Sequence, residues 1–270
     1  MLAPIVDAAW LRDHRDEIVV ADVRFYLDGR SARAAYDAGH LPGAVFVDLE
    51  RWLAAHGTPE DGRHPLPTPE RFAEGMGACG IGDATAVVAY DDAGGVIAAR
   101  LVWMLRALGH DAALLDGGLQ AWDGPVEAAQ RPVVPATFTP APWPAERLAG
   151  PGDAADPANV VIDARQRERF AGEPDGIDPR AGHIPGARSV PCREHLAADG
   201  RLQPVEELRA RLAAAGIDGE APVVSYCGSG VTACHNLLVL EHAGLGLGRL
   251  YPGSWSQWSN DASRPVATGD

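Results

Sequence analysis

The strongest constraint on the fold of this chain is an internal repeat. The motif GHLPGA at residues 39–44 recurs as GHIPGA at residues 182–187. Before each copy, an apolar run ends in an aspartate-x-arginine triplet, at residues 22–24 and again at residues 163–165. Self-similarity of this kind indicates that one supersecondary unit has been used more than once.

The same order of landmarks continues downstream. The run VVAY at residues 87–90 matches VVSY at residues 223–226. Two further pairs are separated by the same distance along the chain: Gly117 with Gly253, and Trp122 with Trp258. Four landmarks in the same order predict that the chain consists of two copies of one unit.

Composition between the copies predicts where they are joined. We expect a first domain over residues 1–124, a linker over 125–158 and a second domain over 159–270. The linker is rich in proline, which lacks a donor N–H and disfavours regular structure, so a semi-rigid connection is expected. Trp143 is the expected apolar anchor of this segment.

Each copy alternates short apolar runs, typical of buried strands, with longer amphipathic stretches, typical of helices. Strands are predicted at 19–23, 45–47, 86–90 and 113–115, and again at 160–164, 188–190, 223–226 and 248–251. Helices are predicted at 33–38, 69–76 and 95–108, and again at 205–215 and 231–243. This alternation predicts an α/β fold in which each domain has a parallel sheet flanked by helices on both faces.

Composition excludes several classes of function. The net charge of −14, without a basic run, argues against a nucleic-acid partner. Neither a charged-then-apolar leader nor an apolar run of membrane length is found, so we expect a cytoplasmic protein without a membrane partner. All 23 basic residues are arginine, which excludes Schiff-base chemistry and a lysine-dependent phosphate loop. The four cysteines show no CxxC spacing, so neither a metal nor a disulfide framework is expected.

One cysteine lies where a sheet of this kind places reactive groups. Cys227 follows the predicted strand 223–226 and precedes Gly228-Ser229-Gly230 and a predicted helix. Helix amino ends and glycine-rich turns direct N–H groups at an anion, which favours the reactive thiolate. The pattern therefore predicts an accessible cysteine of lowered pKa at the carboxyl edge of the sheet. The alternative is a buried structural cysteine.

The repeat supplies an internal comparison for this cysteine. When the VVAY and VVSY runs are aligned, Asp91 corresponds to Cys227. A carboxylate cannot carry sulfur, so only the second copy retains the nucleophile. The first copy is then expected to be structural or to contribute one wall of the site.

These features together resemble those of the two-domain rhodanese-type sulfurtransferases, over nearly the whole chain. The segment CGSGVTA at residues 227–233 is similar to the active loop of the 3-mercaptopyruvate members, whereas thiosulfate members typically show CRKGVT. The uncharged Gly228 and Ser229 replace the basic pair that would hold dianionic thiosulfate, which favours a monoanionic donor.

The resemblance implies a two-step transfer without a metal or an organic cofactor. Cys227 would take sulfur from 3-mercaptopyruvate as a persulfide, release pyruvate and pass the sulfur to cyanide or to a thiol acceptor such as thioredoxin. The loop would hold the donor and the persulfide through Gly228, Gly230, Val231, Thr232 and Ala233.

Further site residues follow from the same resemblance. Arg169 matches the arginine that binds the donor's carboxylate, and Arg180 is the nearest candidate for a second substrate arginine. Ser229, His64 and Glu50 resemble a Ser-His-acid relay that would move the proton required by the leaving group. Because His64 and Glu50 come from the first copy, the site would lie between the two halves. The alternatives are that Arg169 is a surface arginine and that His64 is a loop histidine.

Three other functions compete with this interpretation. A thiosulfate sulfurtransferase would use the same persulfide on Cys227. A dual-specificity-type phosphatase requires Cys-x5-Arg, but Ala233 stands where that arginine would be. A non-enzymatic sulfur carrier or binding module would leave Cys227 unreactive, so thiol reactivity separates it from the enzymes.

Overall fold

The computed structural model describes residues 2–128 and 132–269 and divides the chain into two compact units. Unit 1 comprises Met1–Ala55, Pro67–Trp143 and Leu196–Leu202, and unit 2 comprises His56–Leu66, Pro144–His195 and Gln203–Asp270. Residues 56–66 were expected in the first domain but belong to unit 2. Residues 196–202 were expected in the second domain but belong to unit 1. Most of the predicted linker belongs to unit 1.

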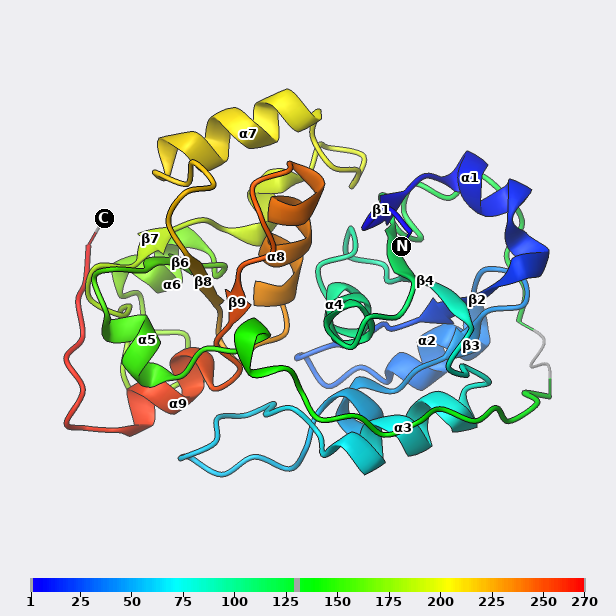
Figure 1. Ribbon diagram of the computed structural model, residues 1–270, viewed down its shortest axis with the longest axis horizontal. Coiled ribbons are helices and arrows are strands. Elements are labelled where there is room, and N and C mark those ends of the chain that lie inside the picture. The colour runs from blue at the N-terminus through cyan, green and yellow to red at the C-terminus, as the bar shows by residue number, and fades with distance from the viewer. Residues whose placement is uncertain (1, 129–131, 270) are drawn as a thin grey trace. The chain divides into compact units, whose positions relative to one another are not determined.

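Unit 1 contains a five-stranded parallel sheet with the order β1-β5-β4-β2-β3, flanked by helices (Figure 1). Its strands are β1 (Ile5–Val6), β2 (Ile18–Asp22), β3 (Val45–Phe46), β4 (Ala86–Tyr90) and β5 (Ala112–Leu115). Its helices are α1 (Ala8–Asp13), α2 (Ala32–Ala38), α3 (Pro69–Ala78) and α4 (Ala99–Ala107), with short helical turns η1 (Arg15–Glu17) and η2 (Leu49–Leu53).

Unit 2 repeats this arrangement with a four-stranded parallel sheet of order β7-β6-β8-β9. Its strands are β6 (Val160–Asp163), β7 (Arg188–Ser189), β8 (Val223–Tyr226) and β9 (Arg249–Leu250). Its helices are α5 (Pro151–Ala155), α6 (Arg167–Ala171), α7 (Val205–Ala214), α8 (Ala233–His242) and α9 (Ser254–Asn260), with turns η3 (Ala145–Arg147) and η4 (Cys192–His195). The predicted α/β fold with helix-flanked parallel sheets is confirmed.

The repeated motifs hold the same local structure in both units. In unit 1 the Arg24 guanidinium binds the Asp22 carboxylate (Nη2–Oδ2, 2.7 Å) and donates to the Gly39 carbonyl at 2.8 Å. In unit 2 Arg165 binds Asp163 at 2.6 Å and the carbonyl of Gly182 at 2.7 Å. Each buried ion pair therefore fastens a strand end to the following GHxPGA turn, which is a structural role common to both copies.

The histidine of each GHxPGA turn packs on an aromatic ring of the preceding helix. His40 stacks on Tyr36 with 3.9 Å between ring centroids, and His183 stacks on Phe170 at 3.6 Å. These pairs make α2 and α6 equivalent elements of the two units.

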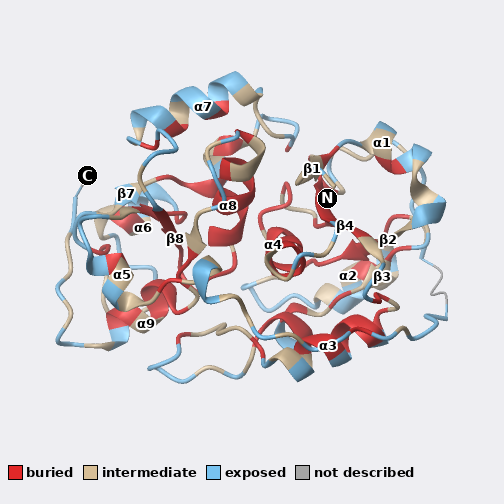
Figure 2. Ribbon diagram, in the orientation of Figure 1, coloured by how far each residue is buried: buried red, intermediate tan, exposed pale blue. Residues whose placement is uncertain are grey.

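Burial follows the predicted hydrophobic pattern. The central strands and α4 and α8 are largely buried, whereas α7 exposes one face (Figure 2). Two helices begin later than predicted: α4 starts at Ala99 and α8 at Ala233. The residues that precede α4 form a loop instead, in which the N–H groups of Gly95, Ile97 and Ala98 donate to the carboxylate of Asp91, directly after β4.

The proline-rich segment packs along unit 1. The Ala136 N–H donates to the Gly77 carbonyl at 3.0 Å, and Thr139 binds the Asp83 carboxylate through both its N–H and its hydroxyl. Trp143 lies 5.2 Å from Phe72 between ring centroids and donates its indole N–H to the Pro67 carbonyl. The expected apolar anchor is therefore present and is seated within unit 1.

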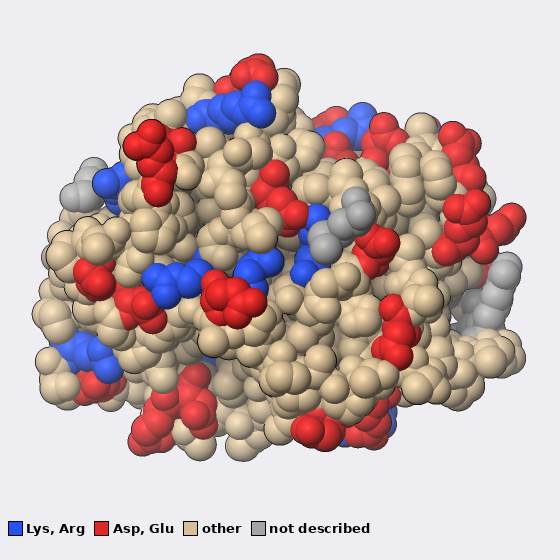
Figure 3. All heavy atoms as spheres, viewed as in Figure 1, with Lys and Arg blue, Asp and Glu red and all other residues tan. Residues whose placement is uncertain are grey.

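Surface charge and helix length add two observations. Acidic and basic side chains are interspersed over the face shown in Figure 3. Within residues 2–128 and 132–269, none of the helices combines the length and the apolar character that crossing a bilayer requires.

Candidate active site

Cys227 lies at the carboxyl end of β8, as predicted. Its Sγ accepts a hydrogen bond from the Gly230 N–H at 3.2 Å, and Gly230 adopts the left-handed conformation that this turn requires (φ 77°). The residue is only 2% exposed, so the expected accessible thiol is instead enclosed by its loop and by the start of α9. Because the thiol is enclosed, a sulfur donor can reach it only if its shape and charge match the surrounding side chains.

Ser254, which follows β9, supports the main chain of Cys227. It is the only non-glycine residue with positive φ (52°) in the described part of the chain, and it is fully buried. Its hydroxyl accepts from the Cys227 N–H at 3.2 Å and donates to the Tyr251 carbonyl at 2.8 Å. The equivalent position in unit 1 is Gly118, with φ 54°. Ser254 was not among the predicted site residues, although its correspondence to a glycine is a signal of unusual backbone geometry.

The corresponding loop of unit 1 shows how this turn binds an anion. Each carboxylate oxygen of Asp91 accepts two main-chain N–H groups at 2.7–2.8 Å. The donors are Ala93, Gly95, Ile97 and Ala98. Gly94 in this loop has φ 76°, nearly the value of Gly230. The unit 1 turn is thus an anion nest permanently filled by its own side chain.

Two guanidinium groups approach the glycine after Cys227. A Cβ at Gly228 would lie 3.0 Å from Arg63 Nη2 and 3.5 Å from Arg169 Nη2. Both arginines are paired with the buried carboxylate of Asp178, and Arg169 is also paired with Asp175. Arg63 was not singled out from the sequence, because only the fold brings residues 56–66 into unit 2. The structure therefore places the guanidinium groups of Arg63 and Arg169 beside the nucleophile loop.

Of the three predicted relay residues, two are in contact. His64 Nδ1 lies 2.7 Å from the Ser229 hydroxyl, within unit 2. In sequence His64 lies in the first copy, as expected, and in the structure its segment 56–66 packs as part of unit 2, the unit that holds Cys227. Glu50 lies on η2 of unit 1, where it is exposed.

Comparison with known proteins agrees with this geometry. The rhodanese-like domain model matches residues 7–124 and 145–261. A Pseudomonas aeruginosa protein named "Probable 3-mercaptopyruvate sulfurtransferase" is 44% identical, with 94% of this chain and 93% of the relative covered. The chain belongs to the rhodanese-like family.

The names of further relatives refer to two sulfur donors, thiosulfate and 3-mercaptopyruvate. SseB of Mycobacterium tuberculosis, provisionally named a thiosulfate sulfurtransferase, is 41% identical, with 94% of this chain and 92% of the relative covered. The structure of the Escherichia coli 3-mercaptopyruvate enzyme SseA superposes with a TM-score of 0.82 at 34% identity, covering 94% of this chain and 99% of that one. The Leishmania major 3-mercaptopyruvate sulfurtransferase gives a TM-score of 0.87 at 33% identity, covering 97% and 75%.

Arg180 of this rhodanese-like chain is engaged in the main chain around the end of α9. Its Nε donates to the Ser259 carbonyl and its Nη1 to the Arg264 carbonyl, each at 2.8 Å. Its Nη2 donates to the carbonyls of Trp258 and Asp261. Because all three nitrogens bind the main chain, this geometry favours a structural role for Arg180. Arg63 is better placed to be the second cation.

The remaining cysteines of this rhodanese-like protein are buried free thiols. Burial raises the pKa of Cys79 to about 11 and that of Cys192 to about 12, so both stay protonated at neutral pH. Cys234 is fully buried in α8 and donates its S–H to the Gly230 carbonyl at 3.4 Å. The burial of these three cysteines and their hydrogen-bond partners argue against any of them as a second nucleophile. Among the described residues, no three His, Cys, Asp or Glu side chains are arranged to hold a metal ion.

Proposed function

We propose that this protein transfers sulfur from 3-mercaptopyruvate to a thiol or to cyanide through a persulfide on Cys227, and releases pyruvate. The observation that carries the proposal is the constellation at Gly228. The sulfur of Cys227 accepts the Gly230 N–H on one side of that glycine, while the guanidinium groups of Arg63 and Arg169 lie against it. A nucleophile and a cationic site for a small carboxylate are thus adjacent.

The first half-reaction forms one S–S bond and breaks one C–S bond. The Cys227 thiolate attacks the mercapto sulfur, and the electron pair of the broken C–S bond passes to the carbon of the leaving enolate. The enolate takes up a proton and becomes pyruvate, while the transferred sulfur remains on Cys227. In the second half-reaction an acceptor thiolate attacks the outer sulfur, and the Cys227 thiolate leaves.

The loop is suited to hold the negative charge of the persulfide. In unit 1 the amides at residues 93, 95 and 97 bind the carboxylate of Asp91. With Asp91 aligned on Cys227, these positions correspond to Ser229, Val231 and Ala233. Together with Gly230, their amides form the predicted nest, and Gly228 and Thr232 complete the turn.

The donor's carboxylate is assigned to Arg169 and Arg63. A guanidinium binds a carboxylate through paired charge-assisted hydrogen bonds. Both arginines are already paired with the carboxylate of Asp178, which supports the proposal that this pair of guanidinium groups can bind a carboxylate. This assignment replaces Arg180, whose nitrogens bind main-chain carbonyls.

The proton for the enolate is assigned to the hydroxyl–imidazole pair of Ser229 and His64. A hydrogen bond of 2.7 Å joins them, and histidine exchanges protons near neutral pH. Glu50 remains the proposed acid of this relay, on the strength of the family resemblance alone.

We propose thioredoxin as an acceptor and the cytoplasm as the working compartment. All four cysteines are free thiols, which is typical of proteins from a reducing compartment. Turnover with thioredoxin should exceed turnover with glutathione at equal thiol concentration, and equal rates would remove thioredoxin as the preferred acceptor.

The donor is tested by kcat/KM for 3-mercaptopyruvate and thiosulfate, measured with cyanide as acceptor. We expect 3-mercaptopyruvate to have the higher value, because Gly228 and Ser229 offer no cation to a dianion. A reversed ratio would establish the second candidate, thiosulfate sulfurtransferase, which the name of the Mycobacterium tuberculosis relative favours. Failure of both donors, with Cys227 unreactive toward alkylation, would instead indicate a binding module.

A further inference from the structure

The two arginines beside Cys227 would by themselves favour a dianionic donor. A Cβ at Gly228 would lie 3.0 Å from Arg63 Nη2, and 3.5 Å and 3.6 Å from Arg169 Nη2 and Nη1. Adjacent guanidinium groups attract a dianion more strongly than a monoanion, because the Coulomb energy is proportional to the charge of the ligand. A preference for monoanionic 3-mercaptopyruvate over thiosulfate therefore needs negative charge close to these arginines.

The loop that follows α6 supplies this negative charge. Gly176 in the loop has φ 70°, and the Asp175 carboxylate accepts the Ile177 N–H at 2.9 Å, so the chain turns tightly there. Ile177 is 45% exposed, whereas the next residue, Asp178, is buried, with its side chain only 3% exposed. A carboxylate buried to this degree needs cationic or hydrogen-bonding partners.

The partners of Asp178 are the two arginines of the site. One of its carboxylate oxygens is paired with Arg63 Nη1, and the other is paired with Arg169 Nη2 at 3.2 Å. The second carboxylate of the loop, that of Asp175, is paired with Arg169 Nε. These two cations and two carboxylates together carry no net charge.

The ion pairs leave guanidinium nitrogens that face the nucleophile loop. The pairs do not use Arg63 Nη2 or Arg169 Nη1, and a carboxylate can accept hydrogen bonds from nitrogens of this kind. The buried charge of Asp178, however, repels a dianion twice as strongly as a monoanion. Arg165 also interacts with Asp178, but its own charge is offset by Asp163, which it binds at 2.6 Å.

We propose that Asp178 is a specificity-determining residue, whose buried charge makes the pair of arginines beside Cys227 select monoanionic donors over dianionic ones. The inference rests on the proposed function and deepens it, because it assigns the choice between 3-mercaptopyruvate and thiosulfate to one carboxylate. Asp178 acts through Arg63 and Arg169 and takes no part in the transfer of sulfur. Removing its charge while keeping its shape should therefore change the ranking of anions by their charge.

The test measures anion binding without turnover. Pyruvate, a monoanion, and sulfate, a dianion, are each titrated for protection of Cys227 against iodoacetamide, at constant ionic strength and at about pH 8, where histidine is uncharged. Asp178→Asn should lower the half-protecting concentration of sulfate relative to that of pyruvate about tenfold or more, since a unit charge at about 4–6 Å changes ion binding by such a factor. Asp178→Glu retains the charge and should keep the ratio close to that of the unsubstituted protein.

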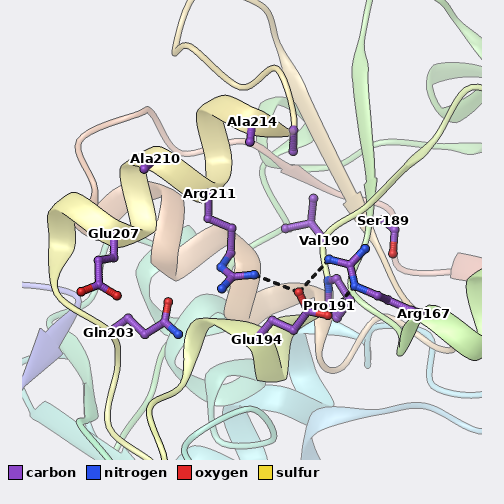
Figure 4. A pocket seen from close by; sticks show the side chains of 11 residues that line it. Arg167, Ser189, Val190, Pro191, Glu194, Gln203, Glu207, Ala210, Arg211 and Ala214 are labelled. Carbon is purple, nitrogen blue, oxygen red and sulfur yellow. Dashed lines mark hydrogen bonds and ion pairs between the residues drawn. The ribbon is translucent and has the colours of Figure 1, made fainter. Parts of the chain in front are cut away.

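Glu194 provides a matched control. It also binds two arginines, Arg167 at 2.6 Å and Arg211 at 2.9 Å, as the dashed lines in Figure 4 mark. These three side chains line a hollow beside α7, and none of them is among the nearest neighbours of a Cβ at Gly228. Glu194→Gln makes the same charge change as Asp178→Asn and should leave the ratio of the two half-protecting concentrations unaltered.

Three outcomes would overturn the proposal: an unchanged ratio in Asp178→Asn, an equal gain in affinity for both anions, and an equal shift of the ratio in Glu194→Gln. If thermal unfolding shows that Asp178→Asn does not fold, Asp175→Asn replaces it. That variant removes the other carboxylate paired with Arg169 and should shift the ratio in the same direction.

The protection assay separates this inference from the proposed function. A chain that transferred no sulfur from either donor would refute the proposed function, whereas the protection ratios would still decide the role of Asp178. In an active enzyme, Asp178→Asn should also raise kcat/KM for thiosulfate relative to kcat/KM for 3-mercaptopyruvate. An unchanged or lower ratio of these two values would contradict the proposal.

Discussion

Replacing Arg169 with glutamine isolates carboxylate recognition from thiol reactivity. The guanidinium lies beside Gly228, and its side chain is only 18% exposed, so solvent screens its interactions weakly. Loss of a charge-assisted hydrogen bond in such a place costs about 2 kcal/mol. At 1.36 kcal/mol for each factor of ten, this corresponds to a rate about 30-fold lower for a reagent that carries a carboxylate.

The assay compares alkylation of Cys227 by iodoacetate and by iodoacetamide. The two reagents have the same leaving group, but only iodoacetate offers a carboxylate to the arginines. Arg169→Gln should lower the iodoacetate-to-iodoacetamide rate ratio about 30-fold and leave the iodoacetamide rate nearly unchanged. Arg63→Gln should act in the same direction. The combined effect should be smaller than the product of the single effects, because both arginines share Asp178.

Arg167→Gln is the control, since Arg167 is on the same helix but is paired with Glu194 on the surface. An unchanged rate ratio in Arg169→Gln would refute the assignment of the carboxylate site. An equal fall in both rates would show that Arg169 acts on the thiolate and not on the donor.

Three further substitutions test other parts of the structure. Asp91→Ala leaves four main-chain N–H groups without an acceptor, two of them on the buried residues Gly95 and Ala98, so the free energy of unfolding in urea should fall by about 2 kcal/mol or more, whereas an unchanged value would refute the nest. Burial lowers the pKa of His235 to about 3 in the folded protein. In the unfolded chain the same histidine binds a proton as the pH falls below about 6.5, well before it does so in the folded protein. Stability should therefore drop by about 2 kcal/mol between pH 6.5 and pH 4.5. His235→Leu should flatten that dependence, and an equally steep fall in the variant would assign the acid lability to other groups. Ser229→Ala should lower kcat for 3-mercaptopyruvate by about 100-fold, the range of general acid catalysis, without slowing alkylation by iodoacetamide; an unaltered kcat would exclude the hydroxyl from proton transfer.

The sequence was sufficient for the architecture because the repeat and the strand pattern are local signals. The strand before Cys227 and the tandem parallel sheets were both predicted from residues close together in the chain. The short strand β1 and the helix α1 were missed, since two residues at a sheet edge leave almost no periodicity to detect.

The site was only partly predictable, because its composition depends on long-range packing. Arg63 stands in a loop without a periodic pattern, and its role becomes visible only when Gly62 and Arg63 pack on the start of α9. Arg180 shows the converse: its place near the family motif suggested a ligand, whereas its nitrogens meet carbonyls distant in sequence. The enclosure of Cys227 was equally hidden, since the residues that cover it come from other segments.

The central claim is that Cys227 accepts the sulfur atom in a covalent half-reaction. It is tested most directly by mixing the protein with 3-mercaptopyruvate without an acceptor and measuring intact mass together with released pyruvate. We predict a gain of one sulfur atom on Cys227, one equivalent of pyruvate for each protein molecule, and neither of these in Cys227→Ser. Continued release of stoichiometric pyruvate by Cys227→Ser, or the added sulfur mapped to another cysteine, would contradict the account.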